Sequence, residues 1–158
     1  QVVSQLTIVV CFQSLILGMA GNAGTQSLAV TIRVLMDENL TGGQKLRLMF
    51  KEMRVGAVNG FLLGLLSLVF IGCYIGLIKG RGFGFGFAVS ACIGFSLAIA
   101  MLISSITGTV IPMFFHKVKI DPAVASGPLI TTVNDLVAVV TYYGMTWLLL
   151  IHLLQLAD

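Results

Sequence analysis

The chain of 158 residues is 58% hydrophobic and only 9% charged, with a formal net charge of +3. Soluble domains carry roughly a quarter charged residues, so the composition excludes a soluble globule and predicts an integral membrane protein. The apolar runs are long and continuous, whereas the strands of a membrane barrel alternate apolar and polar residues. We therefore expect an all-α, polytopic bundle of transmembrane helices that contacts membrane lipid and does not bind nucleic acid.

The first apolar run extends from about residue 2 to residue 36 and is interrupted by GMAGNAGTQSLAVTIR, residues 18–33. In a helix, Asn22, Gln26 and Arg33 share one stripe. The glycines of this stretch let helices approach closely, and where a helix loosens they leave carbonyl oxygens free for water or an ion. Tight packing explains the glycines but not the two amides, so we predict a polar surface here.

Three further apolar runs follow, at about residues 55–78, 85–115 and 123–156. A spanning helix needs roughly 20 residues, so the sequence predicts four spans. The segment LTGGQKLRLMFKEMRVGAVNG before the second run predicts a turn and an amphipathic helix start. Asp121 followed by Pro122 predicts the start of the fourth helix, and Pro128 predicts a break or kink within it.

The basic residues between the runs predict the orientation of the chain. They are Lys45, Arg47, Lys51 and Arg54 in the first gap, Lys79 and Arg81 in the second, and Lys117 and Lys119 in the third. Because cytoplasmic loops carry the excess of Lys and Arg, we place the first and third gaps in the cytoplasm and both ends of the chain outside. The outer amino end and the first residue, Gln1, lead us to expect a fragment of a longer inner- or plasma-membrane protein, with a further span upstream.

Asp135 is the acidic residue that lies deep within an apolar run; the others, Glu52 among them, are in gaps, at run edges or at the end of the chain. An ionised carboxylate at this depth costs several kcal/mol unless water, a partner or a cation compensates it. Thr131, Asp135, Ala138 and Tyr142 share one helical face. A protonated Asp135 bonded to a neighbouring helix is the alternative, but the polar stretch of the first run favours a polar path.

Amide, hydroxyl and carbonyl oxygens with one carboxylate suit a hard cation such as Mg²⁺, which keeps several of its waters. Softer metals favour His and Cys, and neither His116 nor His152 has a partner at metal-binding spacing. These residues therefore favour a hard divalent cation over zinc or copper, and they do not rank Mg²⁺ against Mn²⁺, Co²⁺ or Ca²⁺.

The segments GNAGTQSLAVTIR (21–33) and DPAVASGPLITTVNDLVAVVTYYG (121–144) closely resemble the membrane domain of the MgtE magnesium channels. FKEMRVGAVNG (50–60) is similar to that family's start of the following span. The resemblance covers essentially the whole chain, residues 1–158, as one cation-conducting domain. It implies the last four of five transmembrane helices of a homodimer, without the upstream helix and the cytoplasmic regulatory domains.

The resemblance also implies Mg²⁺ as the bound and transported ion, and it implies site residues. Asp135 corresponds to the pore aspartate that binds hydrated Mg²⁺, and Thr131 to a small residue lining the same metal site. Thr25 departs from a side-chain amide common in the family. Gly21, Asn22, Gly24 and Gln26 match the family's conduction-path helix. Together with Asn134 and Tyr142 of the last span, they are the candidate pore-lining residues.

Other functions remain open at this point. One membrane carboxylate can also serve a proton- or sodium-coupled cation carrier. An intramembrane serine protease built on Ser126 lacks a His at comparable depth, and an aspartyl protease lacks a second membrane Asp, so we expect no enzyme. A purely structural subunit would leave Asp135 without a purpose.

Overall fold

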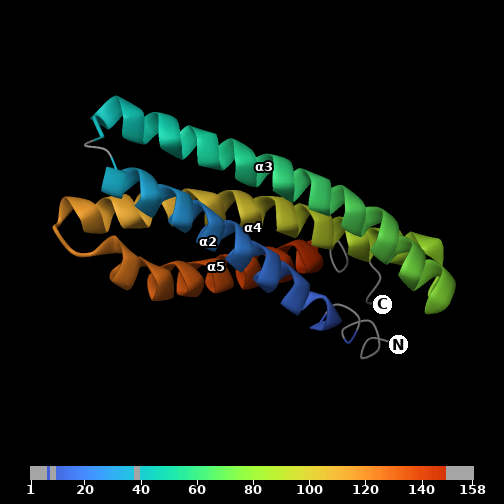
Figure 1. The fold of residues 1–158 in the computed structure, drawn as a ribbon. Helices are drawn as coiled ribbons and strands as arrows, with labels where there is room; N and C mark the ends of the chain where they lie inside the picture. Colours follow the sequence, from blue (N-terminus) through green and yellow to red (C-terminus); the bar gives the residue numbers. More distant parts are fainter. Residues whose placement is uncertain (1–6, 8–9, 38–39, 149–158) are drawn as a thin grey trace.

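The computed structural model describes residue 7 and residues 10–37 and 40–148. These residues form α2 (Gln13–Asp37), α3 (Gly42–Cys73), α4 (Phe83–Lys117) and α5 (Pro122–Thr146), with a π-helical turn, η1 (Tyr74–Ile78), continuing α3. Helix α4 contacts each of the other helices; α3 packs along one side of it, and α2 lies across α4 and α5 (Figure 1). The described residues contain no strand, which confirms the predicted all-α bundle.

Three of the described helical segments are long and apolar enough to cross a membrane: Gly42–Ile78, Phe83–Lys117 and Pro122–Thr146. Helix α2 has 25 residues, which is enough for a bilayer. It is not among the three because the amides, hydroxyls and glycines at its centre lower its hydropathy. The four predicted helices are thus present, and the end of the fourth apolar run, after residue 148, lies outside the described residues.

The starts of α3 and α5 agree with the signals in the sequence. The backbone N–H and the hydroxyl of Thr41 both donate to Oε1 of Gln44, at 2.8 and 2.9 Å, so α3 begins well before the apolar run at about residue 55. At the start of α5, Oδ1 of Asp121 accepts from the backbone N–H of Ala123 at 2.9 Å, and Pro122 occupies the first turn. The predicted start of α5 at Asp121 and Pro122 is confirmed.

Of the break or kink predicted at Pro128, the break is wrong, because α5 is helical without interruption. A proline inside a helix leaves the carbonyl one turn before it without a donor. Here that carbonyl belongs to Val124, which is 75% exposed near the end of the bundle, where water can reach it. One turn after the proline, the hydroxyl of Thr132 donates to the carbonyl of Pro128 at 2.9 Å.

The glycines of α2 do not loosen this helix, which also runs without interruption. The hydroxyl of Thr25 donates to the carbonyl oxygens of Gly21 and Asn22, at 2.9 and 3.1 Å. These oxygens are therefore engaged within the helix, and the expectation of free carbonyls in the polar stretch is not met at these two residues.

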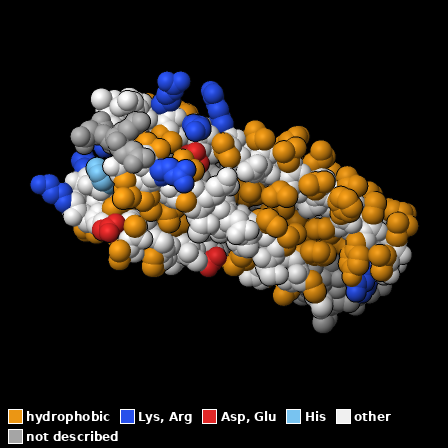
Figure 2. Space-filling model, viewed as in Figure 1, with side chains coloured by type: hydrophobic (Ala, Val, Ile, Leu, Met, Phe, Trp, Pro, Cys, Tyr) orange, Lys and Arg blue, Asp and Glu red, His pale blue; other side chains and the backbone are white. Residues whose placement is uncertain are grey.

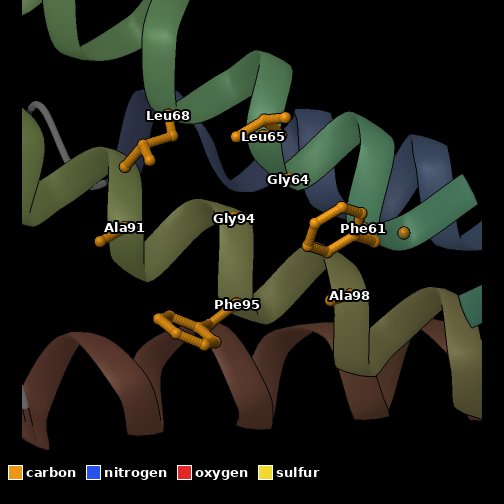
Figure 3. Close-up of a pocket in the computed structure, with 9 residues that line it drawn as sticks. Phe61, Gly64, Leu65, Leu68, Ala91, Gly94, Phe95 and Ala98 are labelled. Atoms are coloured by element: carbon orange, nitrogen blue, oxygen red, sulfur yellow. The ribbon is translucent and has the colours of Figure 1, made fainter. Parts of the chain in front are cut away.

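Small residues bring α3 and α4 into close contact. A Cβ atom on Gly60 would lie 2.8 Å from Cα of Ala98, and one on Gly64 would lie 2.9 Å from the carbonyl oxygen of Gly94. Such spacing is what close helix packing in membranes requires. Beside these glycines, Figure 3 shows an apolar pocket of about 220 Å³ that is lined by Phe61 and Phe95 among others. Its lining offers no charged side chain, so the pocket does not suit a cation.

The basic residues separate toward the two ends of the bundle. The α2–α3 and α4–α5 connections lie at the same end (Figure 1), and Figure 2 shows most of the Lys and Arg side chains on the visible face gathered there. A smaller basic group lies at the opposite end, and hydrophobic side chains cover much of the surface between. The first and third gaps therefore share one end, as the orientation predicted from the sequence requires.

Candidate cation site

The outward face of α2 is polar. Asn22, Gln26 and Arg33, predicted to share one stripe, are all exposed. Within the described part of α2, Met36 is the only large hydrophobic side chain that is exposed. On α3, by contrast, Phe61 is 66% and Phe70 is 70% exposed. Helix α3 thus presents a surface suited to lipid, whereas α2 presents amides and small side chains.

Asp135 and Thr131 lie on the open part of α5. Thr131 is exposed, and its hydroxyl donates to the carbonyl of Gly127 at 3.1 Å. Asp135, one turn further, is partly exposed, and α5 contains no Lys or Arg that could neutralise it. Both side chains therefore present oxygen atoms at the surface of the bundle, where water and a cation can reach them.

Thr131 and Asp135 were predicted to share a helical face with Ala138 and Tyr142. Part of this face is covered by another helix. Ala138 and Tyr142 are 0% and 1% exposed and belong to a buried cluster with Ile16 of α2. Helix α2 crosses α5 (Figure 1), so it covers this part of the face and leaves the part with Thr131 and Asp135 open. Tyr142 thus lies in the interior.

Gly24 and Asn134 also point into the bundle. A Cβ atom on Gly24 would lie 2.3 Å from Nδ2 of Asn134 and 3.1 Å from Cγ2 of Ile130, so α2 and α5 touch at this level. Asn134 is 2% exposed. Because Asp135 directly follows Asn134, this contact places the carboxylate at the level of the polar stretch of α2. Gly21 is partly exposed and has open space where a Cβ atom would stand.

The eight predicted site residues therefore form two groups. Those at the surface are Gly21, Asn22, Gln26, Thr131 and Asp135, and those in the interior are Gly24, Asn134 and Tyr142. The structure brings the two polar segments to one level of the bundle.

Sequence reasoning misplaced Glu52. The sequence puts it in a polar gap, but its side chain is only 4% exposed, and its Oε2 accepts a hydrogen bond from the hydroxyl of Ser27 at 3.0 Å. The missed signal is its spacing: Glu52 stands four residues before Gly56, which begins the glycine series on the buried face of α3. This pair links α2 to α3 in the half of the bundle that holds the basic end.

Sequence reasoning also missed the contribution of α4. The hydroxyl of Ser104 donates to the carbonyl of Ala20 on α2. A Cβ atom on Gly108 would lie 2.4 Å from the carbonyl oxygen of Gly24 and 3.0 Å from Cβ of Ser27. Helix α4 therefore supports the polar stretch of α2 from behind, through small residues of SSITGT (104–109), and the density of hydroxyls in this apolar helix is the signal that was missed.

Comparison with known proteins shows the family of the chain. A family model described as "MgtE: Divalent cation transporter" matches residues 13–145. The magnesium transporter MgtE of Bacillus subtilis (strain 168) is 39% identical over 145 residues, which cover 89% of this chain and 29% of that protein. The protein of the same name from Enterococcus faecalis is 38% identical over 143 residues, covering 90% and 30%.

A third relative is the magnesium transporter MgtE of Thermus thermophilus, which is 28% identical over 149 residues, covering 94% of this chain and 31% of that protein. The chain thus spans less than a third of the length of the curated relatives it matches. The family model covers most of the chain, including α2, α3, α4 and nearly all of α5. The chain therefore belongs to the MgtE family of divalent cation transporters.

Proposed function

We propose that this chain forms the membrane pathway of a magnesium transporter, in which hydrated Mg²⁺ passes a site built around Asp135. The observation that carries the proposal is the position of this carboxylate: it is partly exposed on a membrane-spanning helix that contains no basic residue. Facing lipid, an ionised carboxylate would cost several kcal/mol. Where the carboxylate faces water and a cation, these compensate that cost.

The surface around Asp135 supports a pore between two copies of the chain. The open polar surface consists of Asn22 and Gln26 on α2 and Thr131 and Asp135 on α5. Small residues on a helix surface allow a second helix to approach, and a Cβ atom on Gly18 or Gly21 would meet nothing within 4 Å. A twofold axis beside α2 and α5 would place two such surfaces opposite each other, while the apolar outer face of α3 meets lipid.

The chemistry of the site suits a hydrated ion. Mg²⁺ loses its waters reluctantly and is usually bound through one or two carboxylates. In the proposed pore, the two Asp135 carboxylates accept hydrogen bonds from the ion's water shell and offset its charge. Their mutual repulsion is relieved when a cation sits between them. The amides of Asn22 and Gln26 and the hydroxyl of Thr131 offer further hydrogen bonds to the waters.

The first prediction tests the role of Asp135. Asp135→Asn keeps the size of the side chain but removes its charge, so Mg²⁺ flux into liposomes should fall by at least about tenfold, as for the loss of one charge contact of about 1.4 kcal/mol or more. Flux should be measured without a proton or sodium gradient. A channel conducts Mg²⁺ under these conditions, whereas a coupled carrier needs the gradient. The matched control is Asp121→Asn, since asparagine also caps helices and Asp121 lies at the helix start.

Two results would reject the proposal. One is an Asp135→Asn protein that conducts Mg²⁺ like the unmodified protein. The other is an equal loss of flux in Asp121→Asn, which would mean that removing either charge acts through the fold.

A further inference from the structure

A polar contact between α4 and α5 lies directly behind Asp135. The side chain of Asn134 is 2% exposed, and its Oδ1 accepts from the hydroxyl of Thr107 at 3.2 Å. The same hydroxyl lies 2.9 Å from the carbonyl oxygen of Ser104, one turn earlier on α4. The single hydroxyl proton of Thr107 is therefore shared between the two acceptors, and the side chain bridges its own helix and the carboxamide of the neighbouring one.

The other side of the Asn134 carboxamide is closed by α2. Its Nδ2 lies so near Gly24 that a Cβ atom there would stand 2.3 Å away, and the same atom would be 2.7 Å from Oγ of Ser104. Ser104 in turn donates to the carbonyl of Ala20 on α2. The carboxamide is thus held between α4 and α2, and its freedom to turn is small.

Packing alone does not account for an asparagine at this position. Nδ2 of Asn134 has no hydrogen-bond partner among the described residues, and burying an amide without its hydrogen bonds is unfavourable. An apolar side chain at this position would not carry that cost. The retained polar contact is the bond to Thr107, which fixes the direction of the residue next to Asp135.

We propose that Asn134 and Thr107 are positioning residues for the Asp135 carboxylate, and this inference rests on the proposed function. Adjacent residues on a helix differ in direction by about 100°, so fixing the inward direction of Asn134 also fixes the outward direction of Asp135. The hydroxyl of Thr107 therefore sets, from a different helix, where the carboxylate oxygens stand relative to the ion. Neither residue touches the ion in this scheme.

The experiment compares two threonines of α4 in the complete protein, reconstituted in liposomes. Thr107→Val removes the hydroxyl that holds Asn134 and changes the volume of the side chain little. Thr109→Val is the matched control, because the Thr109 hydroxyl is buried and donates only within α4, to the carbonyl of Ser105 at 2.9 Å. The measured quantities are the Mg²⁺ concentration that gives half-maximal flux, the maximal flux and the unfolding temperature.

We expect Thr107→Val to raise the half-saturating Mg²⁺ concentration about tenfold, as for the loss of groups that hold a metal ligand in place, and Thr109→Val to leave it unchanged. Thr107→Ser, which restores the hydroxyl, should return it toward the original value. A merely structural role would lower the maximal flux or the unfolding temperature and leave the half-saturating concentration as it was. Equal half-saturating concentrations in Thr107→Val and Thr109→Val would overturn the inference.

Should Thr107→Val fail to fold, Thr107→Ala and Thr107→Ser form a second pair, since both lack the methyl group and differ in the hydroxyl. A lower half-saturating concentration for Ser than for Ala supports the inference, and equal values reject it. Asp135→Asn in the same assay separates the two claims. If the Asp135→Asn protein conducts normally, the proposed function fails. If Asp135→Asn loses flux while the Thr107 variants bind Mg²⁺ normally, only the positioning role fails.

Discussion

At the scale of single residues, glycine has opposite effects on stability at two positions. At Gly24 a Cβ atom would stand 2.3 Å from Nδ2 of Asn134 and 2.7 Å from Oγ of Ser104, whereas at Gly127 of α5 it would meet nothing within 4 Å. The first glycine is required by the contact of three helices. The second costs the helix some stability, because Gly is about 1 kcal/mol less favourable than Ala in a helix interior.

The second prediction follows from this contrast. Gly24→Ala should destabilise the protein by about 1–3 kcal/mol, as overpacking of a well-packed interior does, while Gly127→Ala should be neutral or slightly stabilising. Unfolding of both variants by denaturant in detergent measures the difference. Equal stability of the two alanine variants would show that the close contact at Gly24 does not exist.

The burial of Glu52 could not be predicted from its charge and its neighbours in the sequence. A carboxylate near basic residues is normally assigned to a solvated gap, but this one accepts a hydrogen bond from Ser27 in the interior. Its place on the stripe of Gly56, Gly60 and Gly64 was visible in the sequence as a four-residue spacing. The spacing indicates the buried face, whereas the partner on α2 depends on how the helices pack.

At the scale of elements, local signals predicted the helix starts and failed on the helix interiors. Asp121 and Pro122 act on the first turn of their own helix, so the start of α5 could be predicted from a few residues. Pro128 does not break α5, because the carbonyl that it leaves free lies near the end of the bundle. The low helix propensity of proline does not indicate whether the carbonyl that it leaves free will lie where water can reach it.

The candidate site could be predicted in part for the same reason. The periodicity of α5 correctly places Thr131 and Asp135 on one face, but Ala138 and Tyr142 on that face are buried because α2 crosses α5 there. The buried residues of α5 follow a different, four-residue spacing, and its polar members hide the buried face in the sequence; they are Ser126, Ile130, Asn134, Ala138, Tyr142 and Thr146. The supporting residues Ser104 and Thr107 of α4 belong to SSITGT (104–109), a visible cluster of hydroxyl residues in an apolar helix. Their partners on α2 and α5 depend on how the helices pack.

The third prediction concerns the connections between elements. The α2–α3 and α4–α5 connections lie at one end of the bundle (Figure 1), and from the positive-inside rule we expect that end to be cytoplasmic. Cysteines introduced at Lys45 and Lys117 should therefore react with an impermeant thiol reagent from the cytoplasmic side, and one at Arg81 from the outside. Opposite labelling at any of the three positions would reverse the orientation.

At the scale of the whole molecule, the two sides of the bundle suit different environments. The outer face of α3 carries large apolar side chains such as Phe61 and Phe70, whereas Gly18 and Gly21 of α2 leave open space beside amides. A polar surface within a membrane requires water or a protein partner. This asymmetry supports a second copy on the side of α2 and α5.

The fourth prediction tests this pairing. Gly18→Cys should form oxidised cross-links between two copies in lipid, because a twofold axis beside α2 brings the same residue of both copies together. Phe61→Cys on the outer face of α3 is the control and should not cross-link. A protein that stays monomeric in lipid nanodiscs, with no cross-link from Gly18→Cys, would reject the pairing.

The central claim is that hydrated Mg²⁺ is held beside Asp135, and thiol protection at the neighbouring exposed residue tests it most directly. In a background without the native Cys11, Cys73 and Cys92, Thr131→Cys should react more slowly with a cationic, water-soluble thiol reagent when Mg²⁺ is present. The protection should disappear when Asp135→Asn is added. Reaction of Thr131→Cys at the same rate with and without Mg²⁺, or protection that survives Asp135→Asn, would contradict the claim.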